Sequence, residues 1–148
     1  MAYQVKYSSA KQADNKIVPV SVIKNGEILT KTVMGQRASD LEERFFRAAS
    51  KNKSISSVDY QPSFIAGRNI PGEIRLDFMV HAYGLLWPIQ IDGDFAHSSA
   101  QQKEEDKQKD IILNNHLIPL GANPIQRVGE DLLRDQETAD ATVERLFP

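Results

Sequence analysis

Two runs of alternating residues in the middle of the chain constrain the fold more than any other feature. Residues 74–80 have the sequence IRLDFMV and residues 85–92 have LLWPIQID, with HAYG between them. Successive side chains of a β-strand point to opposite faces, so this pattern predicts two antiparallel strands joined by a turn at residues 81–84. With Val80 opposite Leu85, the Ile, Leu, Phe and Val positions give the predicted hairpin one apolar face.

The opposite face of this predicted hairpin carries Asp77, Gln90 and Asp92. The expected register sets Asp77 diagonal to Gln90, about 7–8 Å apart between backbones. Oxygen ligands at this spacing suit a hard cation such as Mg²⁺ or Mn²⁺, which lowers the pKa of a bound water and drives phosphodiester hydrolysis. The alternative is the solvated side of a half-buried hairpin. Because Asp is disfavoured in strands and Gly93 allows a bend or a close ligand, we favour a metal site centred on Asp77 and Asp92.

A helix is predicted from residue 39 to about residue 50, because Ser39 and Glu42 have the spacing of a capping box. The apolar residues that share one stripe of this helix, which we expect to face the core, are Leu41, Phe45 and Ala48. Glu42 lies at the edge of the stripe, so its carboxylate can reach over the sheet as a catalytic group. Its alternative role is to cap the helix with Ser39, and the two roles can coexist. Glu43 is expected to point away.

The other segments are assigned from the same kinds of signal. Asn-Gly at the centre of residues 16–36 predicts an N-terminal β-hairpin. Residues 99–115 predict a long helix that is solvated at first and buried at its end. Short strands are expected at residues 57–62, 117–120 and 125–128, followed by one or two helices within residues 130–146. This order predicts an α/β fold in which a mixed central β-sheet is flanked by helices.

Length and composition exclude several classes of protein. The 148 residues contain no cysteine, so a zinc–thiolate site, a disulfide framework and a cysteine nucleophile are ruled out. The formal net charge of −2 argues against tight DNA binding by bulk charge, but it allows an enzyme with basic residues on one face.

We expect one domain over residues 1–148, with residues 1–15 as a loose arm. The chain has no signal peptide and no run long and apolar enough for a membrane span, so a cytoplasmic protein is expected.

Two further residues are candidates for the site. His97 follows Asp92 by five residues, where it can protonate a leaving group or orient a phosphate. Its alternative is an ordinary loop histidine. Lys109 lies within one turn of Ile112 and Leu113, which would place it near the sheet edge, although lysines in so mixed a helix usually form a solvated ion-pair face.

These residues together resemble the PD-(D/E)XK nuclease superfamily, and most of all its branch of very-short-patch-repair-like endonucleases and small phage-borne relatives. The matching segments, within residues 38–130, are LEERF (41–45), RLDF (75–78), QIDG (90–93), His97 and DKQKDIIL (106–113). The resemblance implies a restriction-endonuclease-like three-layer core that binds a metal ion and hydrolyses DNA in a bacterial or phage-infected cell.

The resemblance also implies a role for each site residue. These roles are the helix carboxylate for Glu42, the central metal ligand for Asp77, the paired positions of the last motif for Gln90 and Asp92, and a branch-specific histidine for His97. Gln90 stands where many members have glutamate, so weaker metal affinity is expected. Asp92 stands where the name of the superfamily has lysine, and Lys109 is the candidate replacement.

The leading functional hypothesis is a Mg²⁺- or Mn²⁺-dependent endodeoxyribonuclease that selects DNA by structure. A Holliday-junction resolvase, a nick or mismatch endonuclease and a homing-type nuclease all fit, with branched or duplex DNA as substrate. A resolvase requires a homodimer, whose contact the N-terminal hairpin can supply. The alternative is a DNA-binding or assembly protein that keeps the nuclease fold without catalysis. The sequence contains no P-loop, GxGxxG, GxSxG or HExxH motif that would indicate another enzyme class.

Overall fold

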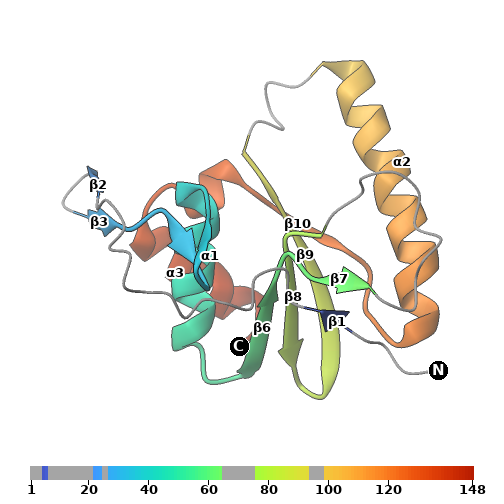
Figure 1. Cartoon of the computed structure of the whole chain (residues 1–148), viewed down its shortest axis with the longest axis horizontal. Helices are drawn as coiled ribbons and strands as arrows, with labels where there is room; N and C mark the ends of the chain where they lie inside the picture. Colours follow the sequence, from blue (N-terminus) through green and yellow to red (C-terminus); the bar gives the residue numbers. More distant parts are fainter. Residues whose placement is uncertain (1–4, 7–21, 25–26, 65–75, 94–98) are drawn as a thin grey trace.

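A four-stranded mixed β-sheet forms the centre of the protein in the computed structural model, which describes residues 5–6, 22–24, 27–64, 76–93 and 99–148 (Figure 1). Its strands, in spatial order, are β10 (Gln126–Gly129), β9 (Leu85–Asp92), β8 (Phe78–Ala82) and β6 (Ile55–Tyr60). β6, β8 and β9 are antiparallel neighbours, whereas β10 runs parallel to β9. The predicted mixed sheet is therefore confirmed.

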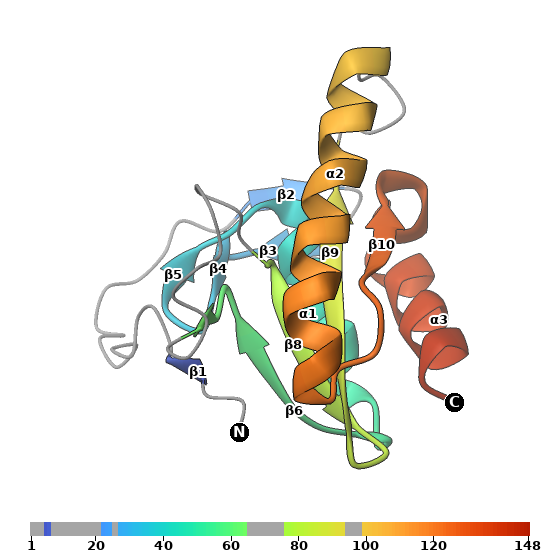
Figure 2. The same cartoon turned by 90° about the vertical axis from the view of Figure 1, so that its right-hand side faces the viewer.

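Helices cover both faces of this sheet. On one face, α1 (Asp40–Lys51) and α3 (Gln136–Leu146) pack with the strands into a core that includes Phe45, Phe78 and Val143. On the other face, α2 (Ala100–Leu117) buries Leu113 and Leu117 against Met79. Figure 2 shows α2 crossing in front of the sheet, with α1 behind it. Short 3₁₀ turns at Ile118–Leu120 (η3) and Glu130–Leu133 (η4) lead into β10 and α3.

The central hairpin forms as an antiparallel pair, but its expected register is wrong. The turn consists of Tyr83 and Gly84 alone, with φ of 56° and 72°. Positive φ at both positions is typical of the tight two-residue turn that matches the twist of paired strands. Val80 consequently faces Trp87 and not Leu85.

The alternative interpretation, a solvated second face on this hairpin, does not hold for its first strand. Phe78, Met79 and Val80 are all fully buried, because α1 covers one face of β8 and α2 covers the other. A strand buried on both faces carries apolar side chains at successive positions, as β8 does here.

Helix α1 begins as predicted. Ser39 is its N-cap, and the reciprocal capping box with Glu42 is present, with Ser39 Oγ accepting from the Glu42 N–H at 3.1 Å. Phe45 and Ala48 are buried and Leu41 packs against the same core, so the predicted stripe is confirmed. The expectation that Glu43 points away is wrong: its side chain is buried.

The N-terminal region forms two small hairpins where one was predicted. β2 (Val22–Lys24) pairs with β3 (Glu27–Leu29) across the expected Asn-Gly position, and β4 (Thr32–Val33) pairs with β5 (Gln36–Arg37). Lys31, with φ of 64°, separates β3 from β4. In the expected arm, β1 (Val5–Lys6) pairs with β7 (Ser63–Phe64). The rest of that arm, and residues 16–21 of the expected hairpin, lie outside the described residues.

The C-terminal half matches its predictions except at one strand. α2 has Ser99 as its N-cap, and β10 overlaps the predicted 125–128 segment but is shifted by one residue toward the C-terminus. The strand expected at residues 117–120 is wrong, because α2 continues to Leu117 and η3 follows with Pro119 near its start. Within the described residues, no helix has the length and apolar character needed to cross a membrane.

Candidate active site

Asp77 and Gln90 are linked side by side where β8 begins. The Asp77 N–H donates to Gln90 Oε1 at 2.8 Å, and the Ile91 N–H donates to Asp77 Oδ2 at 2.7 Å. These bonds extend the contact between the two chain segments beyond the last backbone pair, Phe78 with Ile89. Asp77 therefore lies next to Gln90 and not diagonal to it, as a consequence of the two-residue turn.

The Asp77 carboxyl group is in an environment that disfavours its charge. Burial is the largest of the effects that together raise its pKa to about 6, and the charges of Glu42 and Asp92 contribute to the increase. The Ile91 N–H and Arg127 act in the opposite direction without compensating. The structure thus brings Glu42, Asp77 and Asp92 close enough for their charges to interact, which is the grouping expected from the sequence.

Tyr60 connects Glu42 to this group. Its hydroxyl lies 3.0 Å from Glu42 Oε1 and 3.2 Å from the carbonyl oxygen of Arg37, and it has one proton to donate. Burial and then the Glu42 charge raise the pKa of Tyr60, so the phenol stays protonated. Glu42 Oε1 also accepts the Ser39 N–H at 2.8 Å. Glu42 therefore caps α1 and takes part in the candidate site at the same time.

Arg127 joins Asp92 to helix α2. Its Nε and Nη2 each donate to a different oxygen of Asp110 at 2.7 Å, and its Nη1 donates to Asp92 Oδ1. The hydrogen bonds to Asp110 raise the pKa of Arg127 most, and the negative charges of Asp110 and Asp92 also raise it. The pKa of Asp92 is still raised, because burial outweighs Arg127, and Asp106 and Asp110 add negative charge.

Sequence reasoning missed Tyr60 and Arg127, and it included Asp110 only as part of the charged helix that the family resemblance implies as a support of the site. A signal for Arg127 was present, because it is the charged residue within the predicted strand 125–128. Placing that strand parallel to β9 would have set Arg127 beside Gln90, which is its partner in the register. The predicted helix that connects these two strands would then have suggested Asp110 as the carboxylate partner of Arg127.

The two remaining sequence candidates have different outcomes. His97 lies outside the described residues. Lys109 is exposed, whereas Asp106 and Asp110 are half-buried on the stripe of α2 that continues into Leu113 and Leu117. The expectation that Lys109 lies near the sheet edge is therefore not supported, and among the described residues it is Arg127 whose side chain contacts Asp92.

The donor atoms fit a hard cation in part. The Asp77 carboxylate and the Gln90 amide oxygen are the ligand types that Mg²⁺ accepts, and the unfavourable charge environment of Asp77 is one that a bound cation would relieve. Asp92 has one oxygen already engaged by Arg127. Among the described residues there is no preformed cluster of three or more His, Asp or Glu side chains in metal-binding arrangement.

Comparison with known proteins adds nothing to this site. No protein-family model, curated protein or solved structure matches the chain. The functional argument therefore depends on the residues themselves.

Proposed function

We propose that this protein is a metal-dependent endodeoxyribonuclease with a restriction-endonuclease-like fold, akin to the PD-(D/E)XK superfamily. The observation that carries the proposal is the desolvated Asp77 carboxyl. It accepts a backbone hydrogen bond from β9 and is repelled by the negative charges of Glu42 and Asp92. Such a costly arrangement of carboxylates is typical of functional sites, because a purely structural role would be served better by a neutral side chain.

In this proposal Asp77 and Gln90 hold a Mg²⁺ or Mn²⁺ ion, with Asp92 as a further ligand through the oxygen that Arg127 does not engage. When bound, the cation lowers the pKa of a coordinated water and offsets charge on the scissile phosphate. Glu42 accepts a hydrogen bond from the attacking water, and Tyr60 fixes the orientation of that carboxylate. Arg127 keeps Asp92 in place. His97 is proposed as the general acid or base on the ground of its position in the sequence and of the resemblance.

The proposed substrate is DNA recognised by its structure, as a junction, nick or mismatch, in the cytoplasm of a bacterial or phage-infected cell. If the substrate is a four-way junction, two symmetric cuts require two active sites and hence a homodimer. The N-terminal hairpin is the proposed dimer contact, and the exposed Ile28 on β3 is an apolar side chain suited to it.

A cleavage panel tests the proposal. The full chain is incubated with four-way junction, mismatched, nicked, single-stranded and plain duplex DNA, each with Mg²⁺, with Mn²⁺ and with EDTA. We expect metal-dependent cleavage that is fastest on one of the structured DNAs and absent in EDTA. Cleavage that persists in EDTA, or no cleavage of any DNA with either metal, would contradict the proposal.

The second candidate is a catalytically inactive nuclease fold that binds DNA or assembles with other proteins. Two observations favour it: Gln90 supplies no charge to the metal site, and Arg127 already neutralises Asp92. It predicts DNA binding that is indifferent to Mg²⁺, with no cleavage of any DNA in the panel.

A further inference from the structure

The β4–β5 hairpin lies directly beside the candidate site. The Tyr60 hydroxyl, which contacts Glu42 Oε1, also contacts the carbonyl oxygen of Arg37 on β5, at 3.0 and 3.2 Å. The backbone of Arg37 is therefore two polar contacts away from the Glu42 carboxylate. The two contacts of the Tyr60 hydroxyl thus place the β4–β5 hairpin next to the proposed reaction centre.

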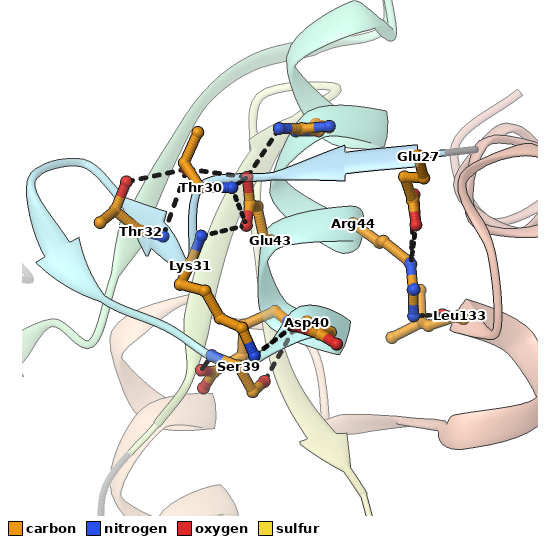
Figure 3. Close-up of polar contacts among 11 residues, drawn as sticks. Glu27, Thr30, Lys31, Thr32, Ser39, Asp40, Glu43, Arg44 and Leu133 are labelled. Carbon is orange, nitrogen blue, oxygen red and sulfur yellow. Dashed lines mark hydrogen bonds and ion pairs between the residues drawn. The ribbon is translucent and has the colours of Figure 1, made fainter. Parts of the chain in front are cut away.

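The base of this hairpin is clamped to α1 by the buried Glu43. Its carboxylate accepts the backbone N–H groups of Thr30 and Lys31, at 3.0 and 2.7 Å, and the Thr30 hydroxyl at 2.9 Å (Figure 3). Arg47 pairs with the same carboxylate at 2.7 Å. Charge-assisted bonds of this kind are the strong ones, and a carboxylate only 2% exposed is little screened by water. The hairpin is consequently a fixed arm and not a loose loop.

The side chain of Arg37 differs from the neighbouring arginines in its charge environment. Arg44 and Arg47 form ion pairs with Glu27 and Glu43, and Arg127 pairs with two aspartates. Arg37 is exposed, and within the part of the chain that the structure describes it forms no ion pair with a carboxylate. The backbone of Arg37 thus lies at the margin of an acidic site, and its exposed side chain has no carboxylate partner among the described residues.

We infer that Arg37 binds a backbone phosphate of the DNA substrate, with the clamped β4–β5 hairpin as the arm that presents it. The inference rests on the proposed nuclease function and assigns part of its substrate-binding surface. A guanidinium matches a phosphate with two parallel hydrogen bonds, and a fixed arm loses little entropy when that contact forms. The arm also offsets the repulsion between DNA and the carboxylates of the site, because a net charge of −2 supplies no general attraction to DNA.

The test is DNA binding by the full chain, with Ca²⁺ in place of Mg²⁺ to prevent cleavage. Fluorescence anisotropy with labelled junction and duplex DNA is measured over a series of salt concentrations. We expect Arg37→Ala to weaken binding about tenfold and to reduce the slope of log Kd against log salt by about one, as the loss of one phosphate contact requires. Arg37→Lys should keep most of the slope but lose part of the affinity.

Arg145→Ala is the matched control, because Arg145 is an exposed arginine in the last turn of α3. It should bind DNA as the wild type does, and urea unfolding should show all three variants folded. An Arg37→Ala variant with wild-type affinity and wild-type salt slope would overturn the inference. A preference of the wild type for RNA over DNA would overturn the choice of DNA as the bound molecule.

The outcomes separate this inference from the proposed function. If the wild type cleaves DNA with Mg²⁺ but Arg37→Ala binds normally, only the phosphate-binding arm is wrong. If the wild type binds DNA in an Arg37-dependent way but never cleaves it, the arm stands and the nuclease proposal fails. If the wild type binds no nucleic acid, both fail.

Discussion

Arg127 and Asp110 form a bidentate ion pair that links the parallel edge strand β10 to helix α2, with both N···O distances at 2.7 Å. The same guanidinium holds Asp92 at the end of β9. Side chains of Arg127 and Asp110 are only 24% and 22% exposed. One arginine therefore fixes both the helix that covers the sheet and a carboxylate of the candidate site.

Removing this arginine should affect stability and the site together. Arg127→Gln leaves Asp92 and Asp110 without their counter-charge, and we expect a loss of about 1–3 kcal/mol in the free energy of unfolding at pH 7. Urea denaturation measures it. Lys51→Gln is the control, because its ion pair with Asp140 is exposed and should cost under about 1 kcal/mol. Equal effects of the two variants would show that the Arg127 pairs contribute no more than a surface ion pair.

Asp77 should make the protein less stable as the pH rises through the range of its titration. Its pKa is about 6 in the folded protein against 3.8 for the ordinary group, so the folded state prefers the neutral acid. Below about pH 4 the Asp77 carboxyl is protonated, and its protonated form contributes fully to the stability of the folded state. This contribution is lost as the pH rises to about 6, and above that pH the folded state carries the full free-energy cost of the charged carboxylate. A tenfold change in proton affinity is worth about 1.4 kcal/mol, so the cost at pH 8 is at most about 3 kcal/mol.

Asp77→Asn removes that cost, so the variant should exceed the wild type in stability by about 1–3 kcal/mol at pH 8 and by little at pH 4. Urea unfolding at the two pH values measures the difference. Asp131→Asn, the same change at an exposed position, should show no such growth with pH. A wild type as stable as Asp77→Asn at pH 8 would mean that Asp77 is not destabilised by its environment.

The two roles of Glu42 can be separated by two substitutions. Ser39→Ala removes the N-cap of α1 and should cost about 1 kcal/mol in stability while leaving cleavage of DNA nearly unchanged. Glu42→Gln keeps a capping-box side chain but removes the charge, so it should leave stability nearly unchanged and abolish most cleavage. Thermal melting and a cleavage assay on the same samples test both. If Glu42→Gln cleaves DNA as fast as the wild type, Glu42 is only a cap.

The sequence was sufficient to predict the central features of the fold and insufficient for the contacts that cross it. Alternation identified the β9 strand with its observed bounds and grouped Asp77, Gln90 and Asp92, because strand periodicity is a local property. The register was wrong by two residues, because the local signal did not show that Tyr83 and Gly84 alone form the turn. Arg127 was missed because its pairing depends on a parallel crossover through the whole of α2.

Glu43 shows a different reason for failure. A helical wheel places it away from the apolar stripe, yet the segment after β3 folds over that side of α1 and offers its backbone N–H groups to the carboxylate. No periodicity in the helix itself contains that information. The burial of the Glu43 carboxylate therefore depends on tertiary contacts that residue spacing within the helix does not predict.

The central claim is tested most directly by the rate at which the wild type and Asp77→Asn cleave the preferred DNA of the panel in Mg²⁺ at pH 8. Asp77→Asn is expected to remain folded, and more stable, while its cleavage rate falls by at least about 100-fold, because loss of even an indirect supporting group at a metal site costs 10–100-fold. Asp131→Asn should cleave as the wild type does. Equal rates for the wild type and Asp77→Asn would contradict the assignment of Asp77 as the centre of the site.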